Sequence, residues 1–442
     1  MAVVVTLIVI WQTSTVSAAG PPSIVRDINA SGNSNPASLT AVGTTLFFTA
    51  DDGIHGTELW KSDGTAAGTK MVKNIRPYGN SSNPADLVNV NGTLFFTAVD
   101  GKHGRELWKS DGTSAGTVLV KDINTHGKNS YGGNGIAVYT SVAVGSRLFF
   151  LTHSGGVWGT TLYVSDGTAA GTYWLEAPSA ATHEWLDNPP EPDHVADTLG
   201  GRFYYVAEND AGKEEIWVSD GTVSGTHRAA GSPQADHLSF LPIHGQSLYF
   251  VTYTDDQSNV RLWKTNGTAS GTKALTSSGA LANVPIEATY MNNRLFFADG
   301  AGGALWKTDG TASGTKKIIN RQAQYVTAAG GHLYFSAYVD GTGDYLWLSD
   351  GSSSGTNPLV SFIDYPASRI TAVGNRVCFH VYNWDTDTWR LWQSDGTKVG
   401  TYSSGEYVNA AATDGPSVSI GSRYFYVADD GSHGVELWSY TP

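Results

Sequence analysis

The segment Glu58-Leu-Trp-Lys-Ser-Asp-Gly-Thr-Ala-Ala-Gly-Thr69 decides the fold, because the chain repeats it from end to end. Glu106–Thr117 is a close copy, six weaker copies follow, and a truncated ninth copy stands at Glu436-Leu-Trp438. The aromatic residue recurs every 41 to 55 residues, at Trp60, Trp108, Tyr163, Trp217, Trp263, Trp306, Trp347, Trp392 and Trp438. A period of about 40–50 residues is typical of the four-stranded blade of a β-propeller.

Each repeat is expected to form four short strands. In the second repeat, Ala85–Val90 and Leu94–Ala98 flank the turn Asn91-Gly92, which suits a two-residue hairpin because both positions tolerate positive φ. The unbroken apolar run Leu94–Ala98 predicts a strand covered on both faces. Glu106–Ser110 follows as the third strand, and its Asp-Gly-Thr turn leads into the fourth. No stretch shows sustained helical periodicity, so we expect an all-β fold.

The two ends of the repeated region are complementary. Residues 23–28 have the pattern of an outermost strand, and residues 435–438 form a third strand that lacks a fourth. We predict that these segments pair and close the ring, which removes a bare sheet edge. Counting third strands gives nine four-stranded blades in a single domain over residues 20–442. Because propellers usually have about 4–8 blades, a ring of eight or fewer blades with an appended fragment is the alternative.

Composition fits this fold and limits the partners. The 442 residues include 52 glycines, 15% charged and 11% aromatic residues, which suits short strands joined by tight turns. The formal net charge of −13 repels phosphate backbones and anionic lipid head groups. We therefore expect no nucleic-acid partner and expect a glycan or an extracellular protein instead. The sequence does not indicate an oligomeric state.

The first 19 residues are interpreted as a secretory signal peptide. The apolar run Ala2–Trp11 is followed by the small residues Val16-Ser-Ala-Ala19, which favours cleavage near Ala18 or Ala19. The run is too short to span a bilayer comfortably, so we expect no membrane insertion after the signal is removed. Because no Lys or Arg precedes the run, an uncleaved anchor or a misassigned start is the alternative. The expected location is secreted or at the cell surface.

An aspartate precedes glycine in the turn between the third and fourth strands. Its carboxylate can accept backbone N–H groups as in an Asx-turn, and the glycine supplies a positive φ. The fifth repeat has asparagine instead, which keeps the acceptor and loses the charge. We therefore predict a structural turn, and not metal binding, for Asp63, Asp111, Asp166, Asp220, Asn266, Asp309, Asp350 and Asp395.

With these motifs the chain resembles the family of bacterial secreted proteins named for the repeat Glu-Leu-Trp-x-x-Asp-Gly-Thr-x-x-Gly-Thr. The resemblance covers nearly everything after the first 19 residues. It implies an extracellular location and a repeat architecture, and it brings no catalytic residues. The turn is also similar to the Asp-box of sialidase-like propellers, which is structural there.

Three loops between second and third strands share the pattern Asp-Gly-x-His-Gly. They occupy Asp52–Gly56, Asp100–Gly104 and Asp430–Gly434, and in a closed ring their blades are neighbours. Imidazole and carboxylate groups can bind a glycan or a divalent metal. The alternative, which we favour, is that each histidine caps its own hairpin. The candidate residues are His55, His103, His433, Asp52, Asp100 and Asp430.

Tryptophans beside carboxylates mark a second group of candidates. An exposed tryptophan can stack on a sugar face while acids bind its hydroxyl groups. The longest insertion, residues 177–196, holds several of them, and others lie in loops of the third and eighth repeats. The alternative is that these tryptophans only cover the top of the ring. The candidates are Trp158, Glu184, Trp185, Asp187, Trp384, Asp385 and Trp389.

These features favour an extracellular ligand-binding or adhesion propeller, with carbohydrate as the expected ligand. One alternative is a polysaccharide hydrolase or lyase that uses Glu184, Asp187, Asp193 and Asp385 at the central channel. Another is a protein-interaction scaffold of the cell surface. The sequence shows no zinc-protease motif, phosphate loop or nucleophile elbow, which weighs against an enzyme without closing the question. We expect no cofactor, with calcium the one metal that the loops could bind.

Overall fold

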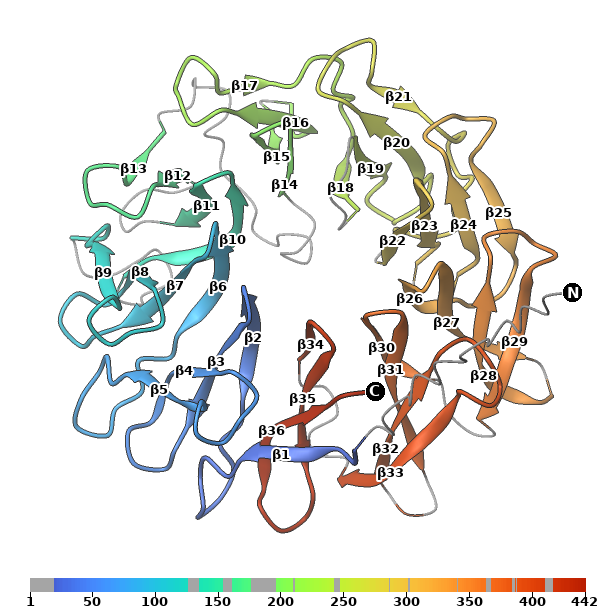
Figure 1. Cartoon of the computed structure of the whole chain (residues 1–442). Coiled ribbons are helices and arrows are strands. Elements are labelled where there is room, and N and C mark those ends of the chain that lie inside the picture. Colours follow the sequence, from blue (N-terminus) through green and yellow to red (C-terminus); the bar gives the residue numbers. More distant parts are fainter. Residues whose placement is uncertain are drawn as a thin grey trace, which may run out of the picture.

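The computed structural model shows a ring of nine sheets, each with four antiparallel strands (Figure 1). It describes the chain except residues 1–19, 126–134, 154–160, 176–195, 210, 242–246, 286, 301–302, 340, 363–366, 384–385, 387 and 410–415. All regular secondary structure in the described part is β. No described residue belongs to a helix of the length and apolarity that a membrane crossing requires. The prediction of an all-β propeller with nine four-stranded blades is confirmed, and the predicted signal peptide lies outside the described residues.

The strands of a blade follow one another from the centre of the ring outwards. The inner strands are β2 (Ala37–Val42), β6 (Ala85–Val90), β10 (Ala137–Val144), β14 (Ala196–Leu199), β18 (His237–Phe240), β22 (Ala288–Met291), β26 (Gln324–Ala329), β30 (Ser368–Val373) and β34 (Ser417–Ile420). The second strands are β3 (Thr45–Asp51), β7 (Thr93–Val99), β11 (Arg147–His153), β15 (Arg202–Glu208), β19 (Leu248–Tyr253), β23 (Arg294–Ala298), β27 (His332–Val339), β31 (Arg376–Asn383) and β35 (Arg423–Asp429). The third strands are β4 (Thr57–Ser62), β8 (Arg105–Ser110), β12 (Thr161–Ser165), β16 (Glu214–Ser219), β20 (Arg261–Thr265), β24 (Leu305–Thr308), β28 (Gly343–Ser349), β32 (Thr388–Ser394) and β36 (Val435–Tyr440). The outer strands are β5 (Lys70–Lys73), β9 (Val118–Lys121), β13 (Tyr173–Trp174), β17 (His227–Arg228), β21 (Lys273–Ala274), β25 (Lys316–Ile319), β29 (Thr356–Phe362), β33 (Tyr402–Asn409) and β1 (Ser23–Arg26).

The ring closes between its first and last strands. β1 runs antiparallel to β36, with Ile24 opposite Trp438 and Ser23 opposite Ser439. Val25 is buried in a cluster that includes Leu437 of the ninth blade and Phe48 of the first blade. The first strand therefore supplies both the outer edge of the last sheet and part of the core that joins the two ends of the ring.

The hydrophobic core consists of layers between neighbouring blades. In β7, Phe96 packs against Phe47 of the first blade, whereas Phe95 packs against Phe150 of the third blade. Alternate residues of a strand point to opposite faces of its sheet, and both faces are covered here. This explains why Leu94–Ala98 is continuously apolar. Burying one such phenylalanine contributes about 1.5–3 kcal/mol. The second strand of a blade therefore stabilises the interfaces with both neighbouring blades.

The Asp-Gly-Thr turns are held by their own side chains. In the second blade, Asp111 Oδ1 accepts the backbone N–H of Thr113 at 2.8 Å and its hydroxyl group at 2.7 Å. The Thr113 hydroxyl accepts the N–H of Gly116 at 2.9 Å, and Thr117 donates to the Thr113 carbonyl at 2.7 Å. Asn266 accepts the equivalent bonds in the fifth blade. These bonds depend on an oxygen acceptor and not on a negative charge.

The same turns also join neighbouring blades. The aromatic ring of Phe47 in the first blade lies against Gly112 in the turn of the second blade, where an added Cβ would lie only 3.1 Å from Phe47 Cζ. Lys73 in β5 donates to the Thr117 carbonyl of that turn at 2.7 Å. Arg26 in β1 donates to the Thr69 carbonyl of the first blade at 2.6 Å. The repeated motif is therefore a contact between blades as well as a hairpin.

Two glycine-to-alanine variants can distinguish the contact between blades from the hairpin itself. Gly351 and Gly92 have nearly the same φ, 87° and 88°. A Cβ at Gly351 would lie 2.8 Å from Phe296 Cζ, whereas a Cβ at Gly92 would meet nothing within 4 Å. We expect Gly351→Ala to reduce stability by about 2–4 kcal/mol and Gly92→Ala by about 1 kcal/mol, because only the first adds overpacking to backbone strain. Thermal unfolding of both variants measures the difference, and equal losses would refute the role in joining blades.

Candidate functional site

Two families of loops share one face of the ring, which we call the loop face. The linkers that connect an outer strand to the next inner strand run beside the loops between second and third strands. Ser34 in the first linker receives the N–H of Asp51 on its carbonyl at 2.9 Å and donates its own N–H to Val435 at 3.0 Å. Ser82 in the next linker donates to the Thr57 carbonyl at 3.1 Å. Functional residues of propellers can therefore gather here from several blades.

Buried glutamates hold these linkers in place. Glu58, the first residue of the repeated motif, accepts the N–H groups of Ile75, Arg76 and Ser82 at 3.0, 3.3 and 3.2 Å. The Ser82 hydroxyl donates to the same carboxylate at 2.6 Å. Glu436 accepts the equivalent bonds from the first linker. Burial raises the pKa of both carboxyl groups, and the hydrogen bonds partly offset this rise.

The Asp-Gly-x-His-Gly loops are closed on themselves. Asp52 Oδ1 accepts the N–H groups of Ile54 and His55 at 3.0 and 2.8 Å, and Asp52 Oδ2 lies 2.7 Å from His55 Nδ1. The pairs Asp100–His103 and Asp430–His433 have the same geometry. Within the described residues no three His, Cys, Asp or Glu side chains gather as a metal ligand set. The bonds are those of histidines that cap their hairpins.

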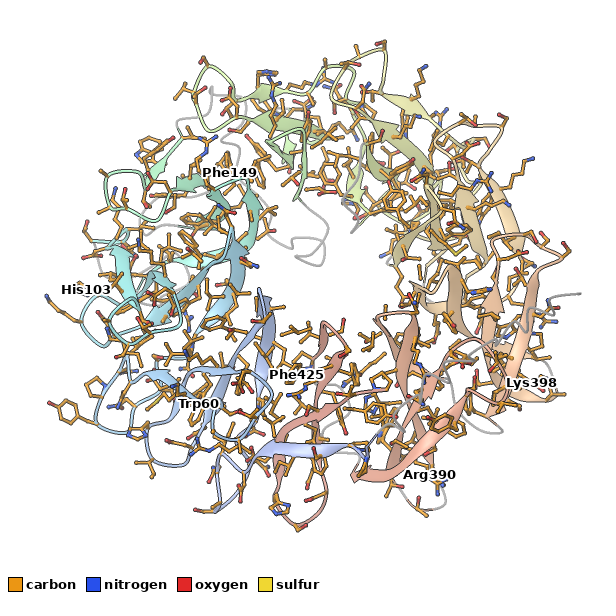
Figure 2. The ribbon with its side chains drawn as sticks, viewed as in Figure 1. Trp60, His103, Phe149, Arg390, Lys398 and Phe425 are labelled. Carbon is orange, nitrogen blue, oxygen red and sulfur yellow. The ribbon has the colours of Figure 1, made fainter. Side chains whose placement is uncertain are left out.

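Two details of these loops bear on their role. The hydrogen bond from Asp430 raises the pKa of His433, which favours the imidazolium form of an exposed ring. Figure 2 places His103 toward the outer edge of the ring and not beside its centre. The Asp100–His103 pair therefore does not lie on the inner wall of the ring.

The tryptophan-rich loops are only partly within the described residues. Trp158, Glu184, Trp185, Asp187, Asp193, Trp384 and Asp385 lie outside them. Trp389 lies in β32 opposite Tyr382, with the ring centroids 5.1 Å apart. It is partly buried against the core between the eighth and ninth blades. Trp389 therefore contributes to packing between blades.

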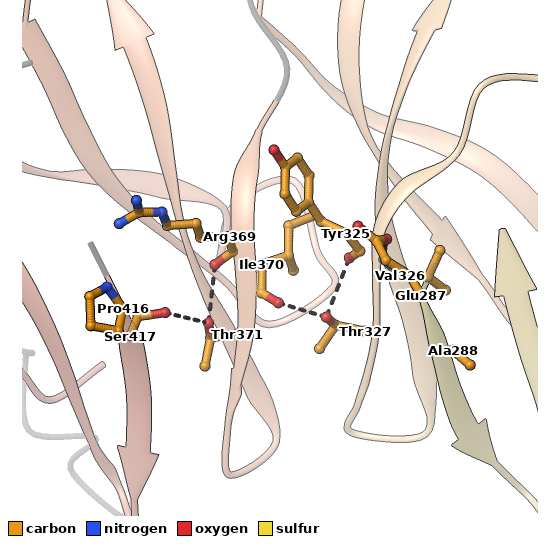
Figure 3. Close-up of a pocket in the computed structure, with 10 residues that line it drawn as sticks. All are labelled: Glu287, Ala288, Tyr325, Val326, Thr327, Arg369, Ile370, Thr371, Pro416 and Ser417. Atoms are coloured by element: carbon orange, nitrogen blue, oxygen red, sulfur yellow. Dashed lines mark hydrogen bonds between the residues drawn. The ribbon is translucent and has the colours of Figure 1, made fainter. Parts of the chain in front are cut away.

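A cavity of about 460 Å³ opens at the inner wall of the sixth to ninth blades (Figure 3). Its residues stand at the starts of the inner strands β22, β26, β30 and β34, where the linkers of the loop face enter. Apolar and polar residues share the wall, and Tyr325 and Arg369 supply the largest side chains. The lining residues are Glu287, Ala288, Tyr325, Val326, Thr327, Arg369, Ile370, Thr371, Pro416 and Ser417.

Two β-bulges shape this wall. Tyr325 and Arg369 have φ values of 56° and 54°, and the strand register shifts at each of them. Residues other than glycine rarely adopt this left-handed conformation, and bulges re-aim side chains near functional sites. Ser38 and Asp86 have the same conformation at the equivalent positions of the first and second blades. The left-handed conformation thus recurs at one position of the repeat, which a different residue occupies in each of these four blades.

Hydrogen bonds between blades fix the bulges. Glu287 of the sixth blade accepts the N–H of Val326 at 3.0 Å, and burial raises the pKa of Glu287. The Thr327 hydroxyl donates to the Ile370 carbonyl at 2.6 Å. Thr371 donates to the Arg369 carbonyl at 3.1 Å and lies 3.2 Å from the Ser417 hydroxyl (Figure 3). The wall is therefore built before any ligand arrives.

The repeated motif does not point to Tyr325 or Arg369, but the inner strands carry a weaker signal. Their first residues read Ala37-Ser-Leu-Thr, Ala85-Asp-Leu-Val, Gln324-Tyr-Val-Thr and Ser368-Arg-Ile-Thr. The third residue is apolar in all four, whereas the second residue changes in size and charge. Such a position in otherwise similar repeats indicates a side chain that packing does not determine.

A second polar cluster joins the fourth and fifth blades. His237, at the start of β18, places Nδ1 3.3 Å from Glu214 Oε1 and Nε2 3.2 Å from Asp255 Oδ1. Its ring stacks on Tyr253, with the centroids 5.1 Å apart. Burial raises the pKa of Glu214 and raises the pKa of Tyr253 to about 12. An imidazole between two carboxyl groups can transfer protons.

The strand order defines the chain as a β-propeller, and a cavity opens on its inner wall. No protein-family model and no curated protein matches the sequence. It is similar to a solved prolyl endopeptidase, with 12% identity and a TM-score of 0.42 over 72% of this chain and 49% of that one. It is similar to puromycin hydrolase, with 13% identity and a TM-score of 0.39 over 79% of this chain and 58% of that one. It is also similar to the propeller domain of the Trilobed protease from Pyrococcus furiosus (9%, 0.36, 69% and 93%). The chain thus spans less than two thirds of the first two proteins, and similarity at these identities concerns the fold alone.

Proposed function

We propose that this chain is an extracellular ligand-binding propeller whose ligand is a carbohydrate, bound in the cavity that Tyr325 and Arg369 line. The observation that carries the proposal is the pair of strained bulges, which places an aromatic and a cationic side chain together on a prebuilt wall. Strain of this kind is retained where the surrounding structure enforces it, and it clusters at functional sites. The extracellular location rests on the apolar N-terminal segment.

The chemistry of the cavity supports a sugar ligand. The phenol ring of Tyr325 offers an apolar face and a hydroxyl group, which together suit the two sides of a pyranose ring. Arg369 adds N–H donors for sugar oxygens. The cavity volume of about 460 Å³ lies within the range of about 300–1,000 Å³ that small-molecule sites occupy.

A glycan array with the secreted chain, followed by titration of the best ligand, tests the proposal. We expect Tyr325→Ala to weaken binding by about tenfold or more, because stacking and a hydrogen bond are lost together. Tyr78→Ala is the matched control, because Tyr78 is 93% exposed and lies outside the cavity. Failure of every glycan to bind, with or without calcium, or undiminished binding by Tyr325→Ala, would refute the proposal.

A hydrolase or lyase is the second candidate, and the His237 cluster is the observation that favours it. The imidazole, Glu214 and Asp255 offer proton donors and acceptors on the loop face. New reducing ends after incubation of the secreted chain with polysaccharides, absent with His237→Ala, would support catalysis over binding alone.

A further inference from the structure

We infer that a second pocket, on the loop face of the seventh blade, binds the ammonium group of an amino sugar. The inference rests on the proposed function for its class of ligand, a carbohydrate, but it uses other residues and does not depend on the inner cavity. The pocket has a volume of about 240 Å³ and lies at the loop-face ends of β26, β27 and β28. The lining residues are Gln322, Gln324, Ser336, Ala337, Tyr338 and Asp344.

The strand register places four of these side chains on one face of the seventh sheet. Gln324 lies opposite Ser336, and Tyr338 lies opposite Asp344. Ser336 and Tyr338 are two residues apart in β27, so their side chains point to the same face. Directly opposite residues of antiparallel strands have Cβ atoms about 4.5–5.5 Å apart. One small group of a ligand can therefore contact Tyr338 and Asp344 together.

The hydroxyl group of Ser336 is the observation that points to a ligand. Ser336 is 1% exposed, and its Oγ has no hydrogen-bond partner within the described part of the chain. The equivalent residue of the second blade, Thr97, donates to Asp86 Oδ2 at 2.8 Å. Leaving a buried hydroxyl group without a partner is costly, and a molecule that enters the pocket removes this cost.

Asp344 gives the pocket a negative charge. Among the described residues that line the pocket, Asp344 alone is charged. Burial raises the pKa of Asp344, and no hydrogen bond or basic side chain of the described residues opposes this rise. A charge that is partly removed from water is favourable when it is paired. A cationic ligand supplies that partner, and the net charge of −13 attracts cations to the chain.

An ammonium group suits Asp344 and Tyr338 together. Its three N–H donors can serve the carboxylate and a neighbouring amide or hydroxyl oxygen, and an aromatic face attracts a cation. Tyr338 is 46% exposed, so a ligand can reach its ring.

The remaining groups of the pocket favour an amino sugar over a lysine side chain. The two glutamine amides and the Ser336 hydroxyl group can donate to and accept from the hydroxyl groups of a sugar ring. A lysine side chain would place its apolar stem against these polar groups and leave them without partners. An amino sugar uses the carboxylate, the aromatic ring and the neutral polar groups at once.

The test is calorimetric titration of the full chain with a glucosamine disaccharide and with the same disaccharide after N-acetylation, which removes its positive charges. We expect the amine form to bind about 10- to 100-fold more tightly, as hydrogen bonds between charged groups imply. Asp344→Asn is expected to abolish this preference. Asp27→Asn removes an exposed carboxylate from the linker of the first blade and is expected to keep the preference, which excludes an effect of net charge alone.

Ser336→Ala separates a role in binding from a role in the fold. We expect it to weaken binding of the amine form by about 3- to 10-fold and to leave the unfolding temperature unchanged, because no protein hydrogen bond is lost. Ser349→Ala is the matched control in the same sheet. The Ser349 hydroxyl group lies 2.6 Å from the Thr356 hydroxyl and accepts the N–H of Gly351 at 3.0 Å, so its loss should lower the unfolding temperature.

The outcomes separate the inference from the proposed function. Equal affinity for the two disaccharides, or a preference that survives in Asp344→Asn, would refute the ammonium assignment. A lower unfolding temperature of Ser336→Ala with unchanged affinity would refute the role of the hydroxyl group in binding. Binding that depends on Tyr325 and not on Asp344 would refute this pocket and support the inner cavity. If neither disaccharide binds, the inference is refuted, while the glycan array still decides on the inner cavity.

Discussion

Glu436→Ala is expected to destabilise the ring closure by about 3–5 kcal/mol. Glu436 accepts the N–H groups of Ile28 and Asn29 at 3.2 and 3.3 Å and the Ser34 hydroxyl group at 2.6 Å. The carboxylate is fully buried, so its loss leaves these donors without a partner, each at a cost of about 1–3 kcal/mol. Thermal unfolding and hydrogen exchange at the Ile28 and Asn29 amides measure the effect.

Asp27→Ala is the matched control, because Asp27 is an exposed carboxylate in the same linker. Its negative charge raises the pKa of Glu436 further, after burial, so its removal should be neutral or slightly stabilising. The stability of Glu436→Gln should fall between those of Glu436→Ala and Asp27→Ala. The amide keeps one oxygen acceptor, but its NH2 group faces donors that the second carboxylate oxygen had accepted. Faster exchange spread evenly over all nine blades in Glu436→Ala would contradict a role at the closure.

A pH-dependent loss of stability is expected from the equivalent glutamate of the second blade. Glu106 is fully buried and accepts the N–H groups of Ile123 and Asn124 at 2.8 and 3.1 Å. Burial raises its pKa from 4.5 to about 7, and the negative charges of Asp122 and Asp100 act in the same direction. Within the described residues, the hydrogen bonds to Glu106 come from these backbone N–H groups.

The sign follows from the raised pKa. The folded chain favours the neutral carboxyl group, so the stabilising contribution is complete below pH 4.5 and is lost as the pH rises through 7. The shift corresponds to about 3 kcal/mol. We expect Glu106→Gln to match the parent chain at pH 5 and to exceed it by about that amount at pH 8. Unfolding at the two pH values measures this difference, with Glu58→Gln as a control whose stability relative to the parent chain should change less between pH 5 and pH 8. A constant offset between parent and Glu106→Gln at both pH values would refute the pKa assignment.

The repeat and the fold could be predicted together because both depend on local patterns. The Asn91-Gly92 turn and the apolar run of β7 describe one hairpin, and nine copies leave few ways to arrange it. The role of the motif glutamate could not be predicted in the same way. Next to buried Leu59 in β4, its polar side chain suggests an exposed position, and its hydrogen-bond partners come from the following linker. For Glu436 those partners lie at the other end of the chain.

The candidate site could not be predicted because its residues meet only around the ring. Tyr325 and Arg369 belong to separate blades, and their side chains are re-aimed by bulges that no turn motif announces. The histidine loops, by contrast, are local. The Asp52–His55 spacing suits either ligand binding or a histidine that caps its own hairpin, the interpretation favoured from the sequence, and in the structure both side chains close their own loop.

The pairing of β1 with β36 has a mechanical consequence. Ser23 lies opposite Ser439, so that anything joined before the one or after the other leaves the ring at the same point. A force applied through both ends would peel β1 away one hydrogen bond at a time, and would not load all of its bonds at once. Tension would therefore open the ring between β1 and β36, while the other eight sheets stay covalently continuous through their hairpins.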